Sequence, residues 1–464
     1  MKKTYIDTAM ERIAPDLILK GGNVVDVFSG RVIKADVIIK DGIICGVGSY
    51  SGENEQDVSG KYVMPGFIDS HVHIESSMTQ PSEYAKAVMP HGITTVIADP
   101  HEITNVCGED GLEFMLKSAK NIPLDVNLML PSCVPATPFE HTGANLDAKT
   151  TQKLAPKFFG IGEMMNYPGI VSGDDETLGK LCLDIIDGHA PLLSGHELDA
   201  YTSAGIKTDH ECSVVEEMTE KISKGMYILL REGTLSLDVA KLIKGVTPYT
   251  LRRCAFCTDD RFVGEIIRDG SIDHCIRKAV SLGLNNIDAI IMATLNACEM
   301  YGMKNKGAIA PSYVADIVVA DDLNLSSISQ VYKNGKLVCE NGTALFECET
   351  VDNSKVTNTV HLPKISADFF KTDVKDKFDA IELIPESIIT KKVTVSYSDS
   401  LSKVCVIERH HNLGTKGIGF VTNYGITNGA IATSIGHDSH NVIVIGDNDS
   451  DMALAVNTLG TSGG

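Results

Sequence analysis

The sequence lacks any apolar run long enough to cross a membrane. Its longest apolar stretches have the length of strands, and Gly, Asp or His interrupts them well short of the roughly 20 residues that a spanning helix needs. It also lacks a cluster of lysines and arginines, and its formal net charge is −20. Because an acidic chain repels polyphosphate, these absences argue against nucleic acid and membranes as partners and favour a small substrate of little charge.

A disulfide framework is missing as well. The 12 cysteines are scattered singly apart from Cys254-Ala-Phe-Cys257, and no secretory signal is recognisable, so we expect reduced thiols in a cytoplasmic protein. The two sulfurs of this Cys-x-x-Cys fall within an expected strand. Packing groups are therefore a better interpretation of them than zinc ligands.

The length of 464 residues suits one large α/β barrel of about 250 residues with smaller flanking domains. Short β-branched runs separated by Gly and Asp turns fill residues 16–63, and residues 315–339 have a similar pattern of short runs and turns. We expect these two segments to pair in one sheet domain. The resulting division has four parts: 1–63 and 310–350 as two parts of a small β domain, 64–309 as the barrel, and 351–464 as a strand-rich C-terminal domain.

Between the two sheet segments the pattern changes to strand, loop, helix. Eight alternating β and α units predict an α/β fold with a closed (β/α)₈ TIM-like barrel, a flanking small β-sandwich domain and a C-terminal α+β region. The stretch 176–187 is short for a helix and a strand, so the barrel is least well defined around its fifth strand. The eight expected strands are 66–73, 92–100, 124–131, 158–164, 185–189, 206–210, 226–231 and 253–259.

Polar side chains stand where these strands end, which is where a barrel places its catalytic residues. The first strand ends in His71-Val-His73, and because strand side chains alternate between faces, both imidazoles leave the same face. An isolated His-x-His is more often structural, so further ligands must support it. Four more expected strands supply them, at Glu163, His189, His210 and Asp259.

Four histidines and two carboxylates provide enough nitrogen and oxygen for two divalent metal ions. Glu163 is suited to bridge them, and imidazole with carboxylate favours Zn, Fe or Mn without choosing among these. A pair of ions can lower the pKa of a shared water from 15.7 to about 7. Asp259 is then placed to orient the hydroxide and accept its proton, a role typically worth about 10²–10⁴ in rate.

This ligand pattern with its bracketing sheet domain resembles the amidohydrolase superfamily. Longer strings, spread over nearly the whole chain, resemble the adenine deaminase family within it. The strings are His71-Val-His-Ile-Glu-Ser-Ser-Met78, Ala98-Asp-Pro-His-Glu-Ile103, Gly160-Ile-Gly-Glu-Met-Met-Asn166, Asp187-Gly-His-Ala-Pro191, Thr208-Asp-His-Glu211, Cys257-Thr-Asp-Asp-Arg261 and His437-Asp-Ser-His-Asn441.

The resemblance implies hydrolytic deamination of free adenine to hypoxanthine and ammonia, a reaction of purine salvage, at a centre of two divalent metal ions. Manganese or iron is commonly associated with the family, and zinc is a further option. Carried onto this sequence, the resemblance implies as metal ligands His71, His73, Glu163, His189, His210 and Asp259.

Three further residues are candidates for contact with the substrate. Attack at C6 of a purine needs a proton delivered to N1, and a carboxylic acid of raised pKa is the usual device, so Glu75 is the candidate acid, with metal ligation as its alternative. His101, at the end of the second strand, could polarise the water or the intermediate. Asp260 could accept a hydrogen bond from the purine edge. Each of the three could instead only hold a loop.

Two features depart from the family pattern. Phe262 stands where members usually have a histidine soon after Asp-Asp-Arg, which removes a polar group near the pocket. The family continues past residue 457, where this chain has a Gly-rich tail, so we expect an incomplete C-terminal domain whose exposed sheet edge invites aggregation. We also expect a homodimer, since barrels with sheet domains often associate.

Three alternatives stay open. The first is a related amidohydrolase acting on a cyclic amide or another nucleobase, although dihydroorotases and hydantoinases generally place a carboxylated lysine where Glu163 stands. The second is a small zinc deaminase of nucleic acids, for which His73-Ile-Glu75 fits but Arg253 replaces the proline needed before the Cys-x-x-Cys. The third is a non-enzymatic binding barrel, which would be expected to lose ligands, or a truncated inactive member, which could keep an intact site.

Overall fold

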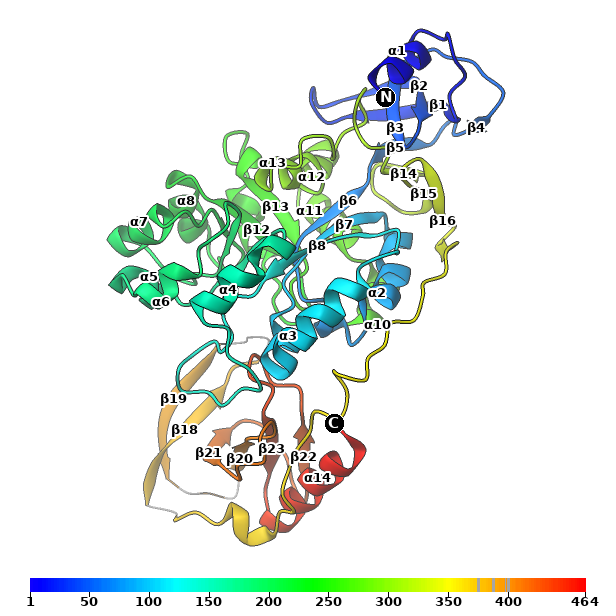
Figure 1. Ribbon diagram of the computed structural model, residues 1–464. Coiled ribbons are helices and arrows are strands. Elements are labelled where there is room, and N and C mark those ends of the chain that lie inside the picture. Colours follow the sequence, from blue (N-terminus) through cyan, green and yellow to red (C-terminus); the bar gives the residue numbers. More distant parts are fainter. Residues whose placement is uncertain (374–375, 386–388, 397, 399–400) are drawn as a thin grey trace. The chain divides into compact units, whose positions relative to one another are not determined.

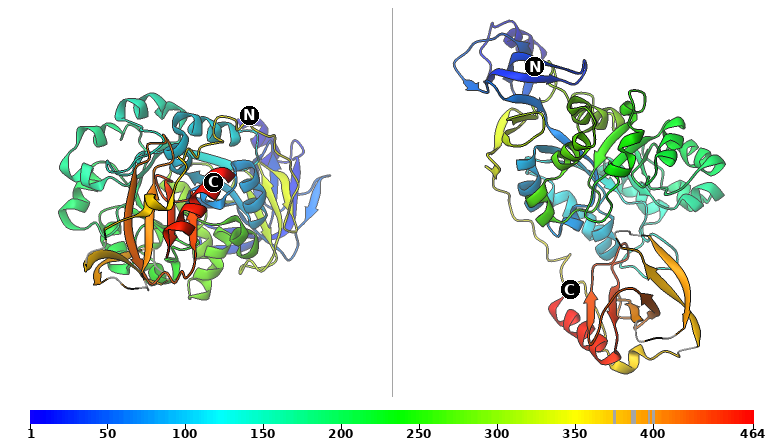
Figure 2. Two further views of the ribbon diagram at one scale, coloured as in Figure 1. Left: turned by 90° about the horizontal axis from the view of Figure 1, so that it is seen from below. Right: turned by 180° about the vertical axis from the view of Figure 1, so that it is seen from behind.

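A computed structural model of the protein is shown in Figure 1 and from two further sides in Figure 2. The structure describes residues 1–373, 376–385, 389–396, 398 and 401–464. The chain forms two compact units. The first consists of Met1–Asp99, Met115–Leu130 and Thr151–Thr350, and the second of Pro100–Phe114, Pro131–Thr150 and Val351–Gly464. The finer division into four domain segments stays a prediction.

Eight parallel strands form the core of the first unit, at the eight places that the sequence predicts. They are β6 (Phe67–Val72), β7 (Ile93–Ala98), β8 (Asp125–Leu130), β9 (Gly160–Met164), β10 (Ile186–Gly188), β11 (Thr208–Asp209), β12 (Tyr227–Arg231) and β13 (Cys254–Cys257). Strands β6 to β10 pair in chain order in one sheet, and β11 to β13 form a second. A parallel bridge between Val72 and Asp259 makes the first and last strands neighbours, so the predicted barrel order is confirmed.

These strands form because they are apolar on both faces, as parallel sheets covered by helices require. Every residue of β7 and β13 is buried. Cys254 and Cys257 are therefore packing groups, as predicted, and burial raises the pKa of the Cys254 thiol to about 12. Zinc ligation needs a thiolate, which this environment disfavours.

The fifth strand is short, as the spacing of the sequence predicts. After α5 (Tyr167–Ser172) and α6 (Asp175–Gly179), β10 has only three residues, and β11 has two. The Gly188 backbone N–H donates to the Thr208 hydroxyl at 2.9 Å, which joins β10 to β11 through a side chain. A side chain at Gly188 would meet the Thr208 carbonyl oxygen at 2.1 Å.

We therefore expect Gly188→Ala to destabilise the protein by about 1–3 kcal/mol, because the two strands must separate to admit a methyl group. The measurement is the free energy of unfolding from denaturant titration. Gly264→Ala is the matched control, since its methyl group meets nothing within 4 Å on helix α10 (Val263–Asp269). The control is expected to be neutral or to stabilise by up to about 1 kcal/mol. Equal stability of the two variants would contradict the prediction.

Helices follow most barrel strands and cover the outside of the barrel (Figure 1). Besides α5, α6 and α10 they are α2 (Pro81–Val88), α7 (Gly195–Ser203), α8 (Val215–Ser223), α9 (Val239–Leu242), α11 (Ile272–Ser281), α12 (Asn286–Met292) and α13 (Leu295–Met300), while α3 (His101–Ser118) and α4 (Ala148–Leu154) have residues in both units. Within the described part of the chain, none of the helices combines the length and the apolar character needed to cross a membrane.

One nine-stranded sheet contains both predicted sheet segments. Its strands are β1 (Leu17–Asp26), β2 (Arg31–Lys40), β3 (Ile43–Gly48), β4 (Glu55–Asp57), β5 (Tyr62–Pro65), β14 (Ile317–Ala320), β15 (Ile328–Lys333), β16 (Lys336–Glu340) and β17 (Thr343–Ala344), and α1 (Lys2–Ala9) precedes them. Antiparallel pairing of β5 with β14 joins the two segments, as predicted. The turns at Asp41-Gly42 and Asn334-Gly335 have positive φ at both residues, the geometry that two-residue hairpins favour.

The second unit contains a six-stranded sheet in the order β19-β18-β21-β20-β23-β22. The strands are β18 (Lys377–Leu383), β19 (Thr390–Ser396), β20 (Ser402–Ile407), β21 (Lys416–Thr422), β22 (Ala430–Thr433) and β23 (Val442–Gly446), followed by α14 (Asp449–Ser462). Met452 and Val456 of α14 pack with Phe370, Cys405 and Val444 in a buried core. The predicted strand-rich region is thus a β sheet with one covering helix.

Candidate metal centre

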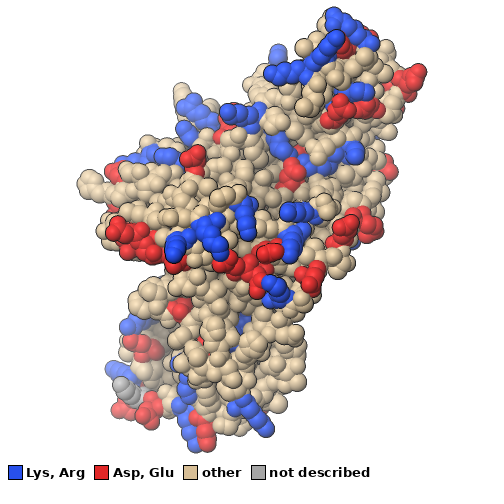
Figure 3. All heavy atoms as spheres, in the orientation of Figure 1, with Lys and Arg blue, Asp and Glu red and all other residues tan. Residues whose placement is uncertain are grey.

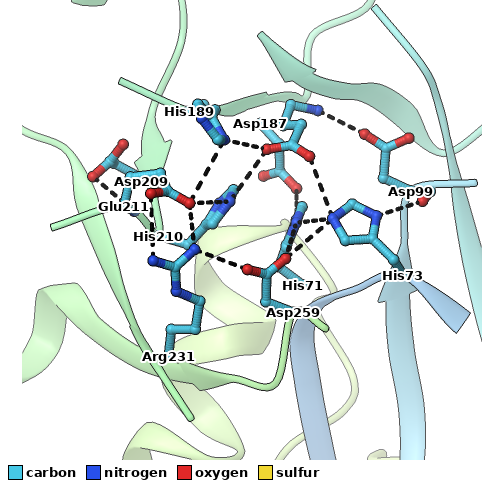
Figure 4. A network of polar contacts seen from close by, with 12 residues as sticks. His71, His73, Asp99, Asp187, His189, Asp209, His210, Glu211, Arg231 and Asp259 are labelled. Carbon is cyan, nitrogen blue, oxygen red and sulfur yellow. Dashed lines mark hydrogen bonds and ion pairs between the residues drawn. The ribbon is translucent and has the colours of Figure 1, made fainter. Parts of the chain in front are cut away.

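The six predicted ligands come together where the barrel strands end. Figure 4 labels five of them, His71, His73, His189, His210 and Asp259. His71 lies on β6, with His73 directly after it, and Glu163 lies on β9. The remaining three ligands follow β10, β11 and β13 within two residues. All except His189 are buried, and its side chain is 22 % exposed.

His73 lies at the centre of a first group of ligand atoms. Its Nε2 atom is 3.2 Å from His71 Nε2, 3.1 Å from Asp259 Oδ1 and 3.3 Å from Glu163 Oε1. Nitrogen and oxygen donors at these separations surround a volume that suits one cation.

A second group forms on the other oxygen of Glu163. Glu163 Oε2 is 2.6 Å from His189 Nδ1 and 3.2 Å from His210 Nε2. The two oxygens of one carboxylate thus face different histidines. This is the geometry expected of a carboxylate that bridges two metal ions, the role that the sequence predicts for Glu163.

Outer contacts turn the ring nitrogens of the histidines toward the centre. His73 Nδ1 donates to the Asp99 carbonyl oxygen at 2.8 Å, which leaves a lone pair on Nε2 in the neutral ring. His71 Nδ1 lies 3.5 Å from Asp187 Oδ2, and Asp187 accepts hydrogen bonds from the Tyr301 and Thr208 hydroxyl groups. The residues present therefore fit divalent cations in their donor atoms and in the contacts that orient them.

The electrostatics of the cluster also favour a cation. Burial alone would lower the pKa of His210, but the hydrogen bond to Glu163 and the surrounding carboxylates raise it to about 9. Burial alone would raise the pKa of Asp259, but the hydrogen bond from His73 and the charge of Arg231 hold it well below its usual range. The Asp259 carboxylate thus stays ionised, and its negative charge stabilises positive charge in the centre.

Sequence reasoning missed Arg231, the last residue of β12. Its Nη1 donates to Asp259 Oδ2 at 2.8 Å and contacts Glu211, while its Nε donates to Asp238 at 3.1 Å. These bonds orient the Asp259 carboxylate, whose backbone has a φ of 56°, a strained region for a residue other than glycine and one that clusters at active sites. The available signal was a single arginine ending an apolar strand of the barrel.

A buried lysine supports two of the histidine ligands. Lys221 of α8 is fully buried and donates to Asp209 Oδ2 at 3.0 Å, to Glu217 at 2.7 Å and to the Ala190 carbonyl oxygen at 2.6 Å. Asp209 precedes His210, and Ala190 follows the ligand after β10. The ion pair therefore fixes the backbone next to both ligands. The amphipathic pattern of the helix made this lysine look like a solvated residue.

The candidate substrate residues lie beyond the ligands. Glu75 is on a 3₁₀ helix, η1 (Ile74–Ser77), two residues after His73. Asp260 accepts a hydrogen bond from Ser76, and one of its oxygens lies within 4.8 Å of ligand atoms of His73 and Asp259. Phe262, which replaces the family histidine, directly precedes α10, and its side chain leaves the residue 47 % exposed.

His101 begins α3 and belongs to the second unit. Its Nε2 lies 3.1 Å from Glu102 Oε1 and 3.5 Å from Asp438 Oδ1. Asp99, two residues before His101, accepts the hydrogen bond from the ligand His73. Its predicted action on the water or the intermediate stays a prediction.

Comparison with known proteins supplies the family. Residues 62–338 match the model of the amidohydrolase family, and residues 383–464 match the model of the adenine deaminase C-terminal domain. The adenine deaminase of Clostridium acetobutylicum is 47 % identical over 479 residues, covering 99 % of this chain and 84 % of the relative. Adenine deaminase 2 of Desulfotalea psychrophila is 45 % identical over 477 residues, covering 98 % of this chain and 83 % of the relative.

Solved structures agree on the fold. Enamidase, described as a member of the amidohydrolase superfamily, matches with a TM-score of 0.54 and 18 % identity, covering 72 % of this chain and 99 % of that one. A β-aspartyl dipeptidase from Fervidobacterium islandicum AW-1 matches with a TM-score of 0.52 and 19 % identity, covering 72 % of this chain and 98 % of that one. At these identities the likeness concerns the fold alone.

Proposed function

The chain belongs to the adenine deaminases of the amidohydrolase family, and we propose that its six clustered side chains hold two divalent metal ions at which free adenine loses its amino group. The reaction converts adenine and water into hypoxanthine and ammonia. We assign this hydrolase to purine salvage. Hydrolysis of a cyclic amide is not favoured, because curated adenine deaminases at 41–47 % identity match nearly the whole chain.

The proposed ions are manganese or iron, with zinc as a further option, since four imidazoles and two carboxylates suit all of them. His71, His73 and Asp259 would hold one ion, His189 and His210 the other, and Glu163 would bridge them. When bound, such ions lower the pKa of water enough to supply hydroxide near neutral pH. Glu163 carries this proposal, because its two oxygens face separate groups of histidines.

Asp259 and Glu75 move the protons in this proposal. As the C6–O bond forms, Glu75 delivers a proton to N1 of the purine ring. The proton that water loses on becoming hydroxide returns Glu75 to its protonated form. Asp259 then takes the proton of the added hydroxyl group on Oδ1, because Arg231 occupies Oδ2. It passes this proton to the amino nitrogen, the C6–N bond breaks, and ammonia leaves.

Two residues complete the proposed site. Asp260 accepts a hydrogen bond from an N–H group on the purine edge, which selects the base by its donor pattern. The hydrogen bond from Ser76 holds the Asp260 carboxylate for this contact. His101 is assigned a polarising role on the water or the intermediate, because it follows the second barrel strand in the sequence.

The test is reconstitution of metal-free protein with Mn(II) or Fe(II), followed by assay of ammonia release from adenine, adenosine, cytosine and dihydroorotate. We expect release from adenine alone, and metal analysis that accounts for two ions at the barrel cluster. Folded, metal-loaded protein that releases no ammonia from adenine would refute the deaminase. Release from dihydroorotate or cytosine would redirect the assignment to another amidohydrolase substrate.

The charge distribution fits a small-molecule partner. On the face that Figure 3 shows, lysines and arginines are interspersed with acidic side chains instead of forming a basic stripe. We therefore propose no nucleic-acid partner. All 12 cysteines are free, which supports the proposed reducing, cytoplasmic location. A homodimer remains our proposal for the assembly, and light scattering after size-exclusion chromatography measures it directly.

A further inference from the structure

The second unit brings Glu102, His437 and His440 together, three residues to which the proposed deamination gives no role. Glu102, the second residue of α3, is 3 % exposed. One of its oxygens contacts His437 Nδ1 and the other contacts His440 Nε2. His101 Nε2 lies 3.1 Å from the same carboxylate and 3.5 Å from Asp438 Oδ1. Three imidazoles therefore converge on one buried carboxylate, with a second carboxylate beside them.

The chemistry of this set is that of a transition-metal site. Imidazole nitrogen with carboxylate oxygen binds Zn, Fe, Mn or Co, and the Nδ1 and Nε2 atoms that face Glu102 are the ring atoms that ligate. The negative charge of Asp438 reaches Glu140 as well, where it adds to burial in raising the pKa of that carboxyl group. A divalent cation would neutralise this charge.

The position of the cluster in the chain also suits a metal. Glu102 lies 335 and 338 positions from its two partners, which stand in the loop between β22 and β23. A bond across so long a loop removes much chain entropy, so an ion there would stabilise the unit. The His437 side chain is 42 % exposed, which leaves a path for the ion.

One contact would have to change on ligation. The Gly436 backbone N–H donates to His440 Nδ1 at 3.3 Å, which in the neutral ring places the proton on Nε2. Ligation through Nε2 gives up this long hydrogen bond. The alternative arrangement, in which the imidazoles only donate hydrogen bonds to Glu102, is therefore the competing outcome of the test.

We propose that Glu102, His437 and His440, with His101 and Asp438 beside them, form a third divalent transition-metal site that ties the start of α3 to the β22–β23 loop. It shares no ligand with the barrel centre. The proposal therefore does not depend on the deaminase activity.

The experiment counts metal ions per chain in the full-length protein. Metal-free protein is titrated with Co(II) and with Zn(II), and bound metal is measured after gel filtration, alongside the visible absorption of bound Co(II). The variants are His437→Ala and the double variant His437→Ala/His440→Ala. His411→Ala is the matched control, since this exposed histidine of the same unit lies outside the cluster and its ring contacts the Thr142 carbonyl oxygen at 3.1 Å.

We expect three ions in the wild-type protein and in His411→Ala, and two in the double variant, with loss of one component of the Co(II) spectrum. His437→Ala alone, which removes a half-exposed side chain, keeps the measurement possible if the double variant does not fold, and is expected to weaken the third ion at least tenfold. Glu163→Gln should lose ions from the barrel and retain this one. Equal ion counts in the wild-type protein and in a folded double variant would overturn the proposal, whatever number of ions the barrel holds.

Discussion

Asp259→Asn is expected to abolish turnover of adenine while the barrel stays folded. The asparagine amide keeps the size of the side chain and can still contact Arg231, but it cannot take a proton from the added hydroxyl group. Loss of a positioned acid or base costs about 10²–10⁴ in rate, and loss of a charged ligand 3.1 Å from His73 Nε2 adds to it. The measurement is kcat for ammonia release, with metal content determined on the same sample.

The matched control is Asp175→Asn, which removes an exposed carboxylate from the first turn of α6. It should retain turnover and cost at most a few tenths of a kcal/mol, the usual size of a surface charge near a helix N-terminus. Far-UV circular dichroism and the unfolding midpoint identify a folding defect in either variant. Turnover within a few-fold of wild type in Asp259→Asn at full metal content would contradict the assigned proton transfer.

Glu163→Gln is expected to have the largest effect on metal binding. The neutral amide offers one oxygen, whereas the carboxylate presents Oε1 to His73 at 3.3 Å and Oε2 to His210 at 3.2 Å. We expect the barrel to retain one ion at most and turnover to fall by at least about 10²-fold, since water activation depends on the ions. Metal analysis of purified protein and kcat measured across added Mn(II) test both effects.

Glu216→Gln serves as the control for this substitution, because Glu216 lies exposed on α8. Excess Mn(II) gives a second readout. If Glu163 bridges, high metal concentration should restore occupancy only in part. Full occupancy with normal turnover would show that the histidines hold both ions without it.

The sequence determined the strands and the ends at which ligands stand. The alternation of side chains along 66–73 placed His71 and His73 on one face, and the apolar runs of β7 and β13 predicted buried strands. The Asp41-Gly42 and Asn334-Gly335 turns likewise followed from local conformational preference. These features depend on neighbours within a few residues, which is why the sequence alone reveals them.

The tertiary structure decided which polar groups meet. Arg231 and Lys221 look in the sequence like ordinary charged residues, yet one orients Asp259 and the other lies fully buried beside two ligands. The same holds for Glu102, whose partners lie more than 300 positions away.

What the sequence by itself determined is therefore the order of the barrel strands and the identity of six residues at their ends. What only the tertiary structure decided is the pairing of those residues with each other and with distant charges. Barrel closure brings Asp69 to the backbone N–H of Thr258, 189 positions along the chain. Contacts between residues so far apart in the sequence depend on how the whole chain packs. A buried charged group is shielded from water, so it must pair with the groups that packing places beside it.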